Sequence, residues 1–268
     1  MDWIIHTIQE DDIKKFVLGL VLAIGFSSIL LGTDGSLEKV LKDGYFVVGL
    51  DDTYPPVGFK DEDGEFVGLD IDLAKEAARR LGVEARFKSC EWDGIIFELR
   101  GKQIDMVWNG MVITPERERQ ISFSKPYYAV GQYIFSRKGE PYTKIAELDG
   151  KTVGVQLGST GQVAVERNTI ADDLKDLRKY ANVVEVLLDL EAGRLDAAVM
   201  SIFVGGYYNL TKNTLALSTE NFSEELLGVG FRHEDVSFRE AIDKAIDEMK
   251  ADGTFSQIEA KWLGDLIN

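Results

Sequence analysis

The chain has 268 residues, of which 45% are hydrophobic, and a formal net charge of −16 at pH 7. This length and composition suffice for one large or two modest globular domains. The negative charge argues against nucleic acid or an anionic membrane surface as a partner, because both would repel the chain. The single cysteine, Cys90, excludes an internal disulfide, and the two histidines, His6 and His233, lie far apart in the sequence. We therefore expect no metal site and no cofactor.

The first 35 residues differ in composition from the rest. Lys14 and Lys15 precede an apolar run from Phe16 to Leu31, and polar residues follow it. This pattern is typical of a secretory signal peptide, and the run is shorter than the about 20 apolar residues of a membrane anchor. Acidic residues at 10–12 and the lack of a clear cleavage site leave an uncleaved anchor open. We expect a periplasmic or extracellular location, reached through a signal that is cleaved or stays as an anchor.

Apolar strands and amphipathic helices alternate along the remaining chain. The clearest helix is 68–81, in which Leu69, Leu73 and Ala77 fall on one face and Gly82 follows the last turn. This alternation predicts parallel sheets with crossover helices, in which ligands bind at the carboxyl ends of the strands. The predicted strands are 45–50, 83–87, 104–108, 151–156, 195–200 and 226–231, and the predicted helices are 36–42, 68–81, 94–100, one from 162, 183–192, 238–252 and 254–264.

One strand end carries the strongest local signal for a ligand site. The apolar strand 104–108 stops at the turn dipeptide Asn109-Gly110, and Thr114 can cap the helix that follows. The backbone N–H groups of residues 112–114 are then free to bind a carboxylate or phosphate at the helix start, where Arg117 can add a planar guanidinium. An ordinary turn with a solvated arginine would explain the same residues.

A second turn of the same character follows the strand 151–156. Gly158-Ser-Thr-Gly161 separates this strand from the next helix and leaves further backbone donors bare. Two α/β units with one donor-rich corner each indicate two lobes that face each other across a cleft.

Five motifs surround and include these corners: Gly49-Leu-Asp-Asp-Thr-Tyr-Pro-Pro56, Gly68-Leu-Asp-Ile-Asp-Leu-Ala74, Asp105 to Arg117, Phe123-Ser-Lys-Pro-Tyr-Tyr128 and Gly154-Val-Gln-Leu-Gly-Ser-Thr-Gly161. In this order and spacing, the chain resembles the extracytoplasmic, or periplasmic, solute-binding proteins of polar amino-acid ABC importers. That family includes the histidine-, lysine/arginine/ornithine- and glutamine-binding proteins. The resemblance covers about Ser36 to Leu266, which is nearly all of the chain beyond its N-terminal segment.

The resemblance implies an α/β, two-lobed periplasmic-binding-protein fold. Each lobe would be a mostly parallel sheet flanked by helices, and the chain would cross between the lobes near Val130 to Phe135 and Leu226 to Phe231. Such paired crossings act as a hinge that closes on a ligand. The implied division is 1–35 for the signal or anchor, 36–130 with 229–268 for lobe one, and 131–228 for lobe two.

The resemblance also assigns roles to residues of the cleft. Arg117 and the N–H groups near Val112 would hold the α-carboxylate of the ligand, with a further donor from Thr160. Asp51 would face the ligand side chain and Tyr54 would pack over it; the alternative for Asp51 is a helix or turn cap. No residue is predicted to be catalytic or to bind a metal. The candidate ligand-binding residues are Asp51, Tyr54, Trp92, Asn109, Gly110, Met111, Val112, Arg117, Ser159, Thr160 and Ser201.

Two positions depart from the family pattern. Val112 stands where relatives often have serine or threonine, so that one hydroxyl donor is missing. Ser201 stands where relatives place an aspartate for the α-amino group, and Asp196 lies five residues earlier, near the strand start, where it should point away from the cleft. Either Asp51 replaces the missing carboxylate, or the ligand lacks an ordinary α-amino group.

The predicted function is the capture of a polar or basic L-amino acid for an ABC importer. The expected partners are this ligand and a membrane permease, and we expect a monomer that binds no nucleic acid. Dehydratases have arisen on this scaffold, but the sequence contains no recognisable set of nucleophile, base and orienting group, so we expect no enzyme activity. The alternatives are a different small carboxylate as ligand and an anchored ligand sensor.

Overall fold

The computed structural model describes residues 34–267. The apolar run predicted as a signal peptide or anchor lies outside these residues. No helix within 34–267 has both the length and the apolar character needed to span a membrane.

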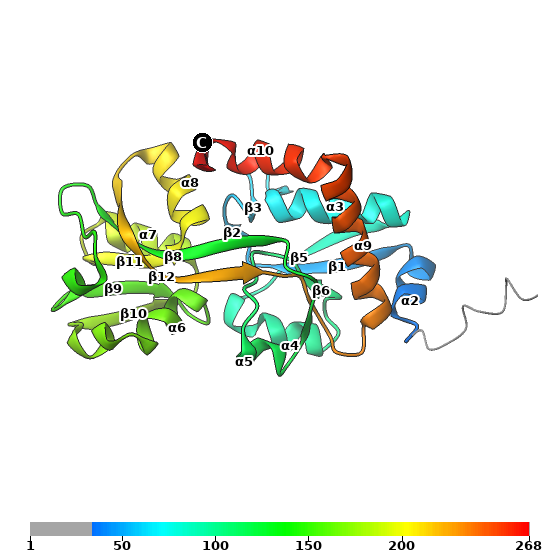
Figure 1. Ribbon diagram of the computed structural model, residues 1–268, viewed down its shortest axis with the longest axis horizontal. Helices are drawn as coiled ribbons and strands as arrows, with labels where there is room; N and C mark the ends of the chain where they lie inside the picture. The colour runs from blue at the N-terminus through cyan, green and yellow to red at the C-terminus, as the bar shows by residue number, and fades with distance from the viewer. Residues whose placement is uncertain (1–33, 268) are drawn as a thin grey trace, which may run out of the picture. The chain divides into compact units, whose positions relative to one another are not determined.

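The first sheet has the strand order β5-β1-β6-β13-β7 (Figure 1). β1 is parallel to β5 and β6, whereas β13 is antiparallel to both of its neighbours. Four of the five strands therefore share one direction. The bounds are Tyr45–Leu50 for β1, Glu84–Ser89 for β5, Met106–Val107 for β6, Ser122–Phe123 for β7 and Gly230–Phe231 for β13.

The second sheet has the strand order β10-β9-β11-β8-β12. β9 is parallel to β10 and β11, and here β8 is the strand that runs against its neighbours. The bounds are Tyr128–Arg137 for β8, Thr152–Gln156 for β9, Asp176–Tyr180 for β10, Ala197–Ser201 for β11 and Leu215–Leu227 for β12. A small third sheet contains β2 (Thr53–Tyr54), β3 (Gly58–Lys60) and β4 (Phe66–Val67).

The helices cover both large sheets. One apolar cluster joins the first sheet to α2, α3, α9 and α10, and another joins it to α4. Two further clusters join the second sheet to α7 and to α6. We call the first sheet with its helices lobe one and the second sheet with its helices lobe two. The helices are α2 (Ser36–Asp43), α3 (Leu69–Leu81), α4 (Ile95–Arg100), α5 (Pro115–Glu118), α6 (Thr160–Arg167), α7 (Val183–Glu191), α8 (Ile202–Lys212), α9 (Val236–Asp252) and α10 (Thr254–Ile267), with short 3-10 helices η1 (Trp92–Gly94), η2 (Ile145–Leu148) and η3 (Thr169–Asp173).

The helix α3 follows the predicted periodicity. Leu69, Leu73 and Ala77 are buried against lobe one, and Gly82 ends the helix in the left-handed conformation with φ of 73°. The N–H of Asp70, in the first turn, donates to the carbonyl of Val57 at 2.9 Å. This bond fixes the start of α3 beside the loop that follows β1.

The chain passes between the two sheets twice. β7 ends at Phe123 and β8 begins at Tyr128, and β12 ends at Leu227 opposite Tyr128. β8 and β12 therefore run side by side as an antiparallel pair from the point where the sheets meet (Figure 1).

The prediction of one strand over 226–231 is wrong. Its first half ends β12 in the second sheet and its second half is β13 in the first sheet, because the backbone changes partner at Gly228 and Val229. A Cβ added at Gly228 would lie 2.9 Å from side-chain atoms of Ile113, so a larger residue there would require the Ile113 side chain to shift. The sequence reading also missed α8, β8, β10, most of β12 and the short strands β2, β3, β4 and β7. The polar and charged residues of β10 and β12 do not form an apolar strand pattern, and two adjacent glycines interrupt the helical sequence of α8.

Candidate functional site

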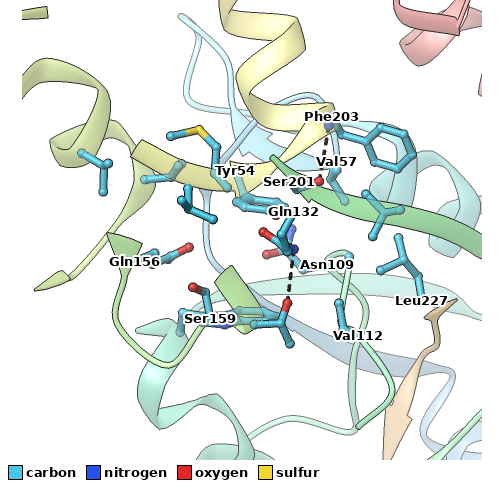
Figure 2. A pocket seen from close by; sticks show the side chains of 18 of the residues that line it. Tyr54, Val57, Asn109, Val112, Gln132, Gln156, Ser159, Ser201, Phe203 and Leu227 are labelled. Carbon is cyan, nitrogen blue, oxygen red and sulfur yellow. Dashed lines mark hydrogen bonds between the residues drawn. The ribbon is translucent and has the colours of Figure 1, made fainter. Parts of the chain in front are cut away.

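A pocket lies where the carboxyl ends of β6, β9 and β11 come together (Figure 2). Asn109 and Gly110 enter it after β6, Gln156 and Ser159 come from the end of β9, and Ser201 is the last residue of β11. This is the edge at which parallel sheets bind ligands. Nine of the eleven candidate residues line the pocket, namely Tyr54, Trp92, Asn109, Gly110, Val112, Arg117, Ser159, Thr160 and Ser201.

The turn after β6 has the geometry expected from its sequence. Gly110 has a φ of 61°, and an added Cβ would lie 3.4 Å from the ring of Tyr54. Thr114 caps α5 by accepting a hydrogen bond from the N–H of Arg117 at 3.2 Å. One expected donor is already occupied, since the N–H of Ile113 donates to the carbonyl of Leu226 at 2.8 Å. The prediction that all N–H groups of residues 112–114 are free is therefore wrong for Ile113, because that residue pairs with β12.

Arg117 places a cation at the pocket. Its Nη1 donates to the carbonyl of Val112 at 2.9 Å and its Nη2 to that of Gly158 at 3.2 Å, and the guanidinium lies 5.5 Å from the ring centre of Trp92. Burial lowers the pKa of Arg117 to about 10, partly offset by the nearby charge of Glu225. The group is therefore still charged at neutral pH, and among residues 34–267 it has no ion-pair partner.

Asp51 lies behind the pocket wall rather than on it. One carboxylate oxygen accepts from the N–H and hydroxyl of Thr53 at 2.9 and 2.6 Å, and the other accepts from Nε2 of Gln156 at 2.6 Å. One carboxylate oxygen of Asp51 therefore caps the turn at Thr53, as the alternative interpretation expected. The other oxygen accepts a hydrogen bond from Gln156 of lobe two. Met111 is the second candidate away from the pocket, because its side chain is buried in the apolar cluster of lobe one that contains α4.

Lobe two contributes polar but uncharged groups. Ser159 caps α6 by accepting from the N–H of Gln162 at 3.1 Å. The hydroxyl of Thr160 donates to Glu225 at 2.8 Å and accepts from Nε2 of Gln132 at 3.2 Å. Because its proton is directed to Glu225, the expected donation from the Thr160 hydroxyl to a ligand would need a rearrangement, and only its backbone N–H remains at the helix start.

Ser201 is buried at the pocket end of β11. Its Oγ accepts a hydrogen bond from the N–H of Phe203 at 3.3 Å, as the first capping contact of α8 (Figure 2). Tyr54 lies beside it, and burial raises the pKa of Tyr54 well above its usual value. Asp196 lies at the opposite end of β11 and accepts from the N–H of Thr152 at 2.7 Å. It therefore points away from the pocket, as the sequence indicated.

Sequence reasoning missed two groups of lining residues. Gln132 on β8 and Gln156 on β9 are both buried and hydrogen-bonded at the pocket. The signal in the sequence that could have identified Gln156 is its position three residues before Ser159. The other missed residues form apolar walls, and those of lobe two include Val183, Val186, Val199, Met200, Phe203 and Leu227.

Arg117 is the only charged residue that lines the pocket within residues 34–267. The same part of the chain holds no group of three or more His, Cys, Asp or Glu side chains that could bind a metal. The arrangement is therefore suited to holding one anionic group of a small, otherwise uncharged or apolar molecule.

Two α/β lobes, two chain crossings between them and a pocket with one arginine at the strand ends are features of the class of two-lobed solute-binding proteins. The chain belongs to the bacterial extracellular solute-binding proteins, family 3, whose family model matches residues 46–265. The predicted family is confirmed.

The chain is similar over most of its length to characterised relatives. It is 36% identical over 251 residues to the L-cystine-binding protein TcyJ of Escherichia coli (strain K12), covering 92% of this chain and 93% of the relative. It is 32% identical over 259 residues to the lysine/arginine/ornithine-binding periplasmic protein of the same strain, covering 93% and 97%. A solved structure of an ancestral arginine-binding protein bound to arginine is 42% identical, with a TM-score of 0.78 over 82% of this chain and 98% of that one. The predicted two-lobed α/β fold is thereby confirmed.

Proposed function

We propose that this protein is the ligand-binding component of a bacterial ABC importer, and that it captures an amino acid or a carboxylate of the same skeleton. The observation that carries the proposal is the half-buried guanidinium of Arg117, which lines the pocket and, within residues 34–267, is hydrogen-bonded only to two carbonyl oxygens. A ligand carboxylate would supply its counter-charge through two parallel hydrogen bonds. The relatives named for cystine and for lysine, arginine and ornithine support an amino-acid skeleton.

We propose binding without turnover. Among the described lining residues, the ionisable side chains are Tyr54 and Arg117. Burial keeps Tyr54 neutral, and Arg117 stays charged near neutral pH. General acid or base catalysis needs a group whose pKa lies near the working pH, and neither side chain provides one.

We also propose that the lobes close on the ligand as 36–130 with 229–268 against 131–228. The division is supported by the sheet membership of the strands, except that β8 of the second sheet already begins at Tyr128. It is also supported by three contacts across the cleft: Asp51 with Gln156, Arg117 with the carbonyl of Gly158, and Arg167 with Glu116. A ligand must enter between these contacts, so that they open and re-form. Solution scattering should show a smaller radius of gyration with saturating ligand than without it.

We further propose that the protein is exported and acts together with a membrane permease. The family is extracellular, which supports export through residues 1–35 to the periplasm or the outer face of the membrane. There the protein would act as a monomer and deliver its ligand to a membrane permease. The N-terminus of the mature protein, determined by mass spectrometry, distinguishes a cleaved signal from an anchor.

The test is calorimetry of the purified protein against the proteinogenic amino acids, cystine, ornithine and common organic acids. We expect binding of at least one carboxylate, and Arg117→Ala should weaken it by about tenfold or more, because hydrogen bonds to a charged group are lost. Arg119→Ala is the matched control, since Arg119 lies two residues further on and its side chain is 67% exposed. No binding across the whole set, or full affinity in Arg117→Ala, would contradict the proposal.

A further inference from the structure

The chemistry of the pocket constrains the α-substituent of the ligand. An amino acid brings two opposite charges, a carboxylate and an ammonium. Arg117 offers a partner for the carboxylate, but no described residue lining the pocket carries a negative charge. An ammonium enclosed there would lack a counter-charge, which is unfavourable in a buried site.

Three carboxylates are hydrogen-bonded to lining residues from behind, and each is already engaged. Asp51 binds Thr53 and Gln156. Glu225 accepts from Gln132 at 2.9 Å, from Thr160 at 2.8 Å and from Ser223 at 2.9 Å.

The third carboxylate, Asp70, accepts from the N–H of Gly110 at 2.6 Å and from the hydroxyl of Tyr127 at 2.8 Å. Asp70 is fully buried and does not line the pocket. None of the three carboxylates lines this pocket. Oδ1 of Asp70 has no hydrogen-bond partner within the described residues, but it is buried, and Glu225 lines the adjoining pocket that also contains Arg117 and Thr160.

Asn109 adds an independent observation. It lines the pocket and is only 1% exposed, and its Nδ2 has no hydrogen-bond partner within the described chain. Its Oδ1 accepts from the N–H of Asp51 at 3.1 Å, which fixes the orientation of the amide and leaves Nδ2 as the open group. Figure 2 labels Asn109 among the side chains that line the pocket. A buried donor of this kind needs an acceptor, and an ammonium offers only donors.

We propose that the pocket selects carboxylates whose α-substituent is uncharged and accepts hydrogen bonds, namely 2-oxo or 2-hydroxy acids, over the amino acids of the same skeleton. The proposal rests on the proposed function in one respect, the placement of the ligand carboxylate on Arg117. The substituent oxygen would then accept from Asn109, while Ser201 contributes a neutral hydroxyl. The apolar residues Val183, Val186 and Met200 suit an apolar skeleton on the side of lobe two.

The experiment compares matched triplets that differ only at the α-position. The probes are L-leucine with its 2-hydroxy and 2-oxo analogues, and the corresponding triplets of L-methionine and L-phenylalanine, titrated into the full-length protein by calorimetry. We expect the oxo or hydroxy member to bind about tenfold or more tightly than the amino acid in at least one triplet. Tighter binding of the amino acid in every triplet that binds would overturn the inference and leave the proposed function intact.

Variants at Ser201 and Asp51 identify the cause of the preference. Ser201→Asp introduces a carboxylate at the pocket end of β11, so it should strengthen amino-acid binding and weaken binding of the oxo acid. Ser201→Asn has a similar size to Ser201→Asp without the charge and should affect the binding of both members of a pair alike.

If Asp51→Asn instead weakens binding of the amino acid alone, Asp51 already pairs with the ammonium and the inference is wrong. If no member of any triplet, no proteinogenic amino acid and no other organic acid binds, the proposed function fails together with the inference.

Discussion

The two lobes are built on the same plan. In each sheet three parallel strands are followed by one strand that runs in the opposite direction and by a fifth strand at the edge. In each lobe, an arginine at the end of the reversed strand or directly after it donates to two backbone carbonyls at corresponding positions. Arg232 donates to the carbonyls of Leu99 and Ile104 at 3.0 and 2.6 Å in lobe one.

Arg137 does the same in lobe two, where it donates to Leu190 and Leu195 at 2.9 and 2.6 Å. In both lobes the first carbonyl belongs to the end of a helix, where a cation is favoured by the helix dipole. In both lobes an aspartate follows the second carbonyl. Asp105 and Asp196 each accept from a backbone N–H of the neighbouring strand.

The lobes differ at their pocket ends. The corresponding positions after β1 and at the end of β9 are Asp51 and Gln156, and these two side chains are hydrogen-bonded to each other. Lobe one supplies Arg117, whereas Ser201 ends the corresponding strand of lobe two without a charge. The comparison shows that packing conserves the scaffold of each lobe, while the residues beyond the strand ends determine the ligand chemistry.

The largest expected effect tests the shared arginine contact. Arg232→Met should lower the free energy of unfolding by roughly 3–5 kcal/mol, because Asp105 and Asp235 lose a buried partner. Arg137→Met should cost roughly 1–3 kcal/mol, because the Arg137 side chain is 26% exposed against 10% for Arg232. Urea unfolding followed by circular dichroism measures both values. Equal losses would show that burial does not distinguish the two contacts.

The free energy of unfolding should depend on pH through Asp70, which lies in lobe one. Burial raises the pKa of Asp70 to about 7, despite its hydrogen bonds from Gly110 and Tyr127. Because the pKa of Asp70 is raised in the folded state, the contribution of Asp70 to stability is fully present below about pH 4 and is lost as the pH rises to about 7. The loss from this group is on the order of 4 kcal/mol. Asp70→Asn cannot ionise, so its unfolding free energy should change less over this pH range than that of the wild type, and parallel pH profiles would contradict the assignment.

Alanine substitutions at Gly49 and Gly154, two glycines at corresponding strand positions, should lower the free energy of unfolding by similar amounts. A Cβ added at Gly49 would overlap the side chain of Ile104, and one at Gly154 would overlap that of Leu195. Each substitution by alanine should therefore cost about 1–3 kcal/mol through overpacking. Ile104→Val and Leu195→Val should partly restore stability in the respective double variants, as measured by urea unfolding. If alanine were tolerated at only one of the two glycines, the proposed equivalence of the two positions would be wrong.

The smallest effect concerns a turn at which the lobes differ. Lys102 has a φ of 59° three residues after Leu99, whereas Gly193, with a φ of 73°, occupies the matching place after Leu190. Lys102→Gly should raise stability by roughly 0.5–1 kcal/mol, because relief of left-handed strain exceeds the entropy that glycine adds to the unfolded chain. Gly193→Lys should lower it by a similar amount. Thermal unfolding of both variants reveals the signs, and two changes of the same sign would refute the correspondence.

The sequence by itself determined the elements whose signals are local. The periodic helix over 68–81, the glycine turn at Gly110 and the Thr114 cap all appear at or near the predicted positions. These features depend on residues a few positions apart, for which side-chain periodicity and capping preferences are sufficient. For the same reason the sequence could place Ser201 at a strand end, whereas the family resemblance assigned most candidate residues to the pocket.

Only the tertiary structure decided which polar groups remain available to a ligand. Asp51 is 105 positions from Gln156 in the sequence, and Thr160 is 65 positions from Glu225, yet these hydrogen bonds redirect the groups that the sequence assigned to ligand binding. Gln132 was missed because it lies on β8, whose partner β12 has no regular apolar pattern. Long-range pairing of polar side chains leaves no local periodicity, because the partners lie on different elements, within lobe two for Thr160 and Glu225 and in different lobes for Asp51 and Gln156.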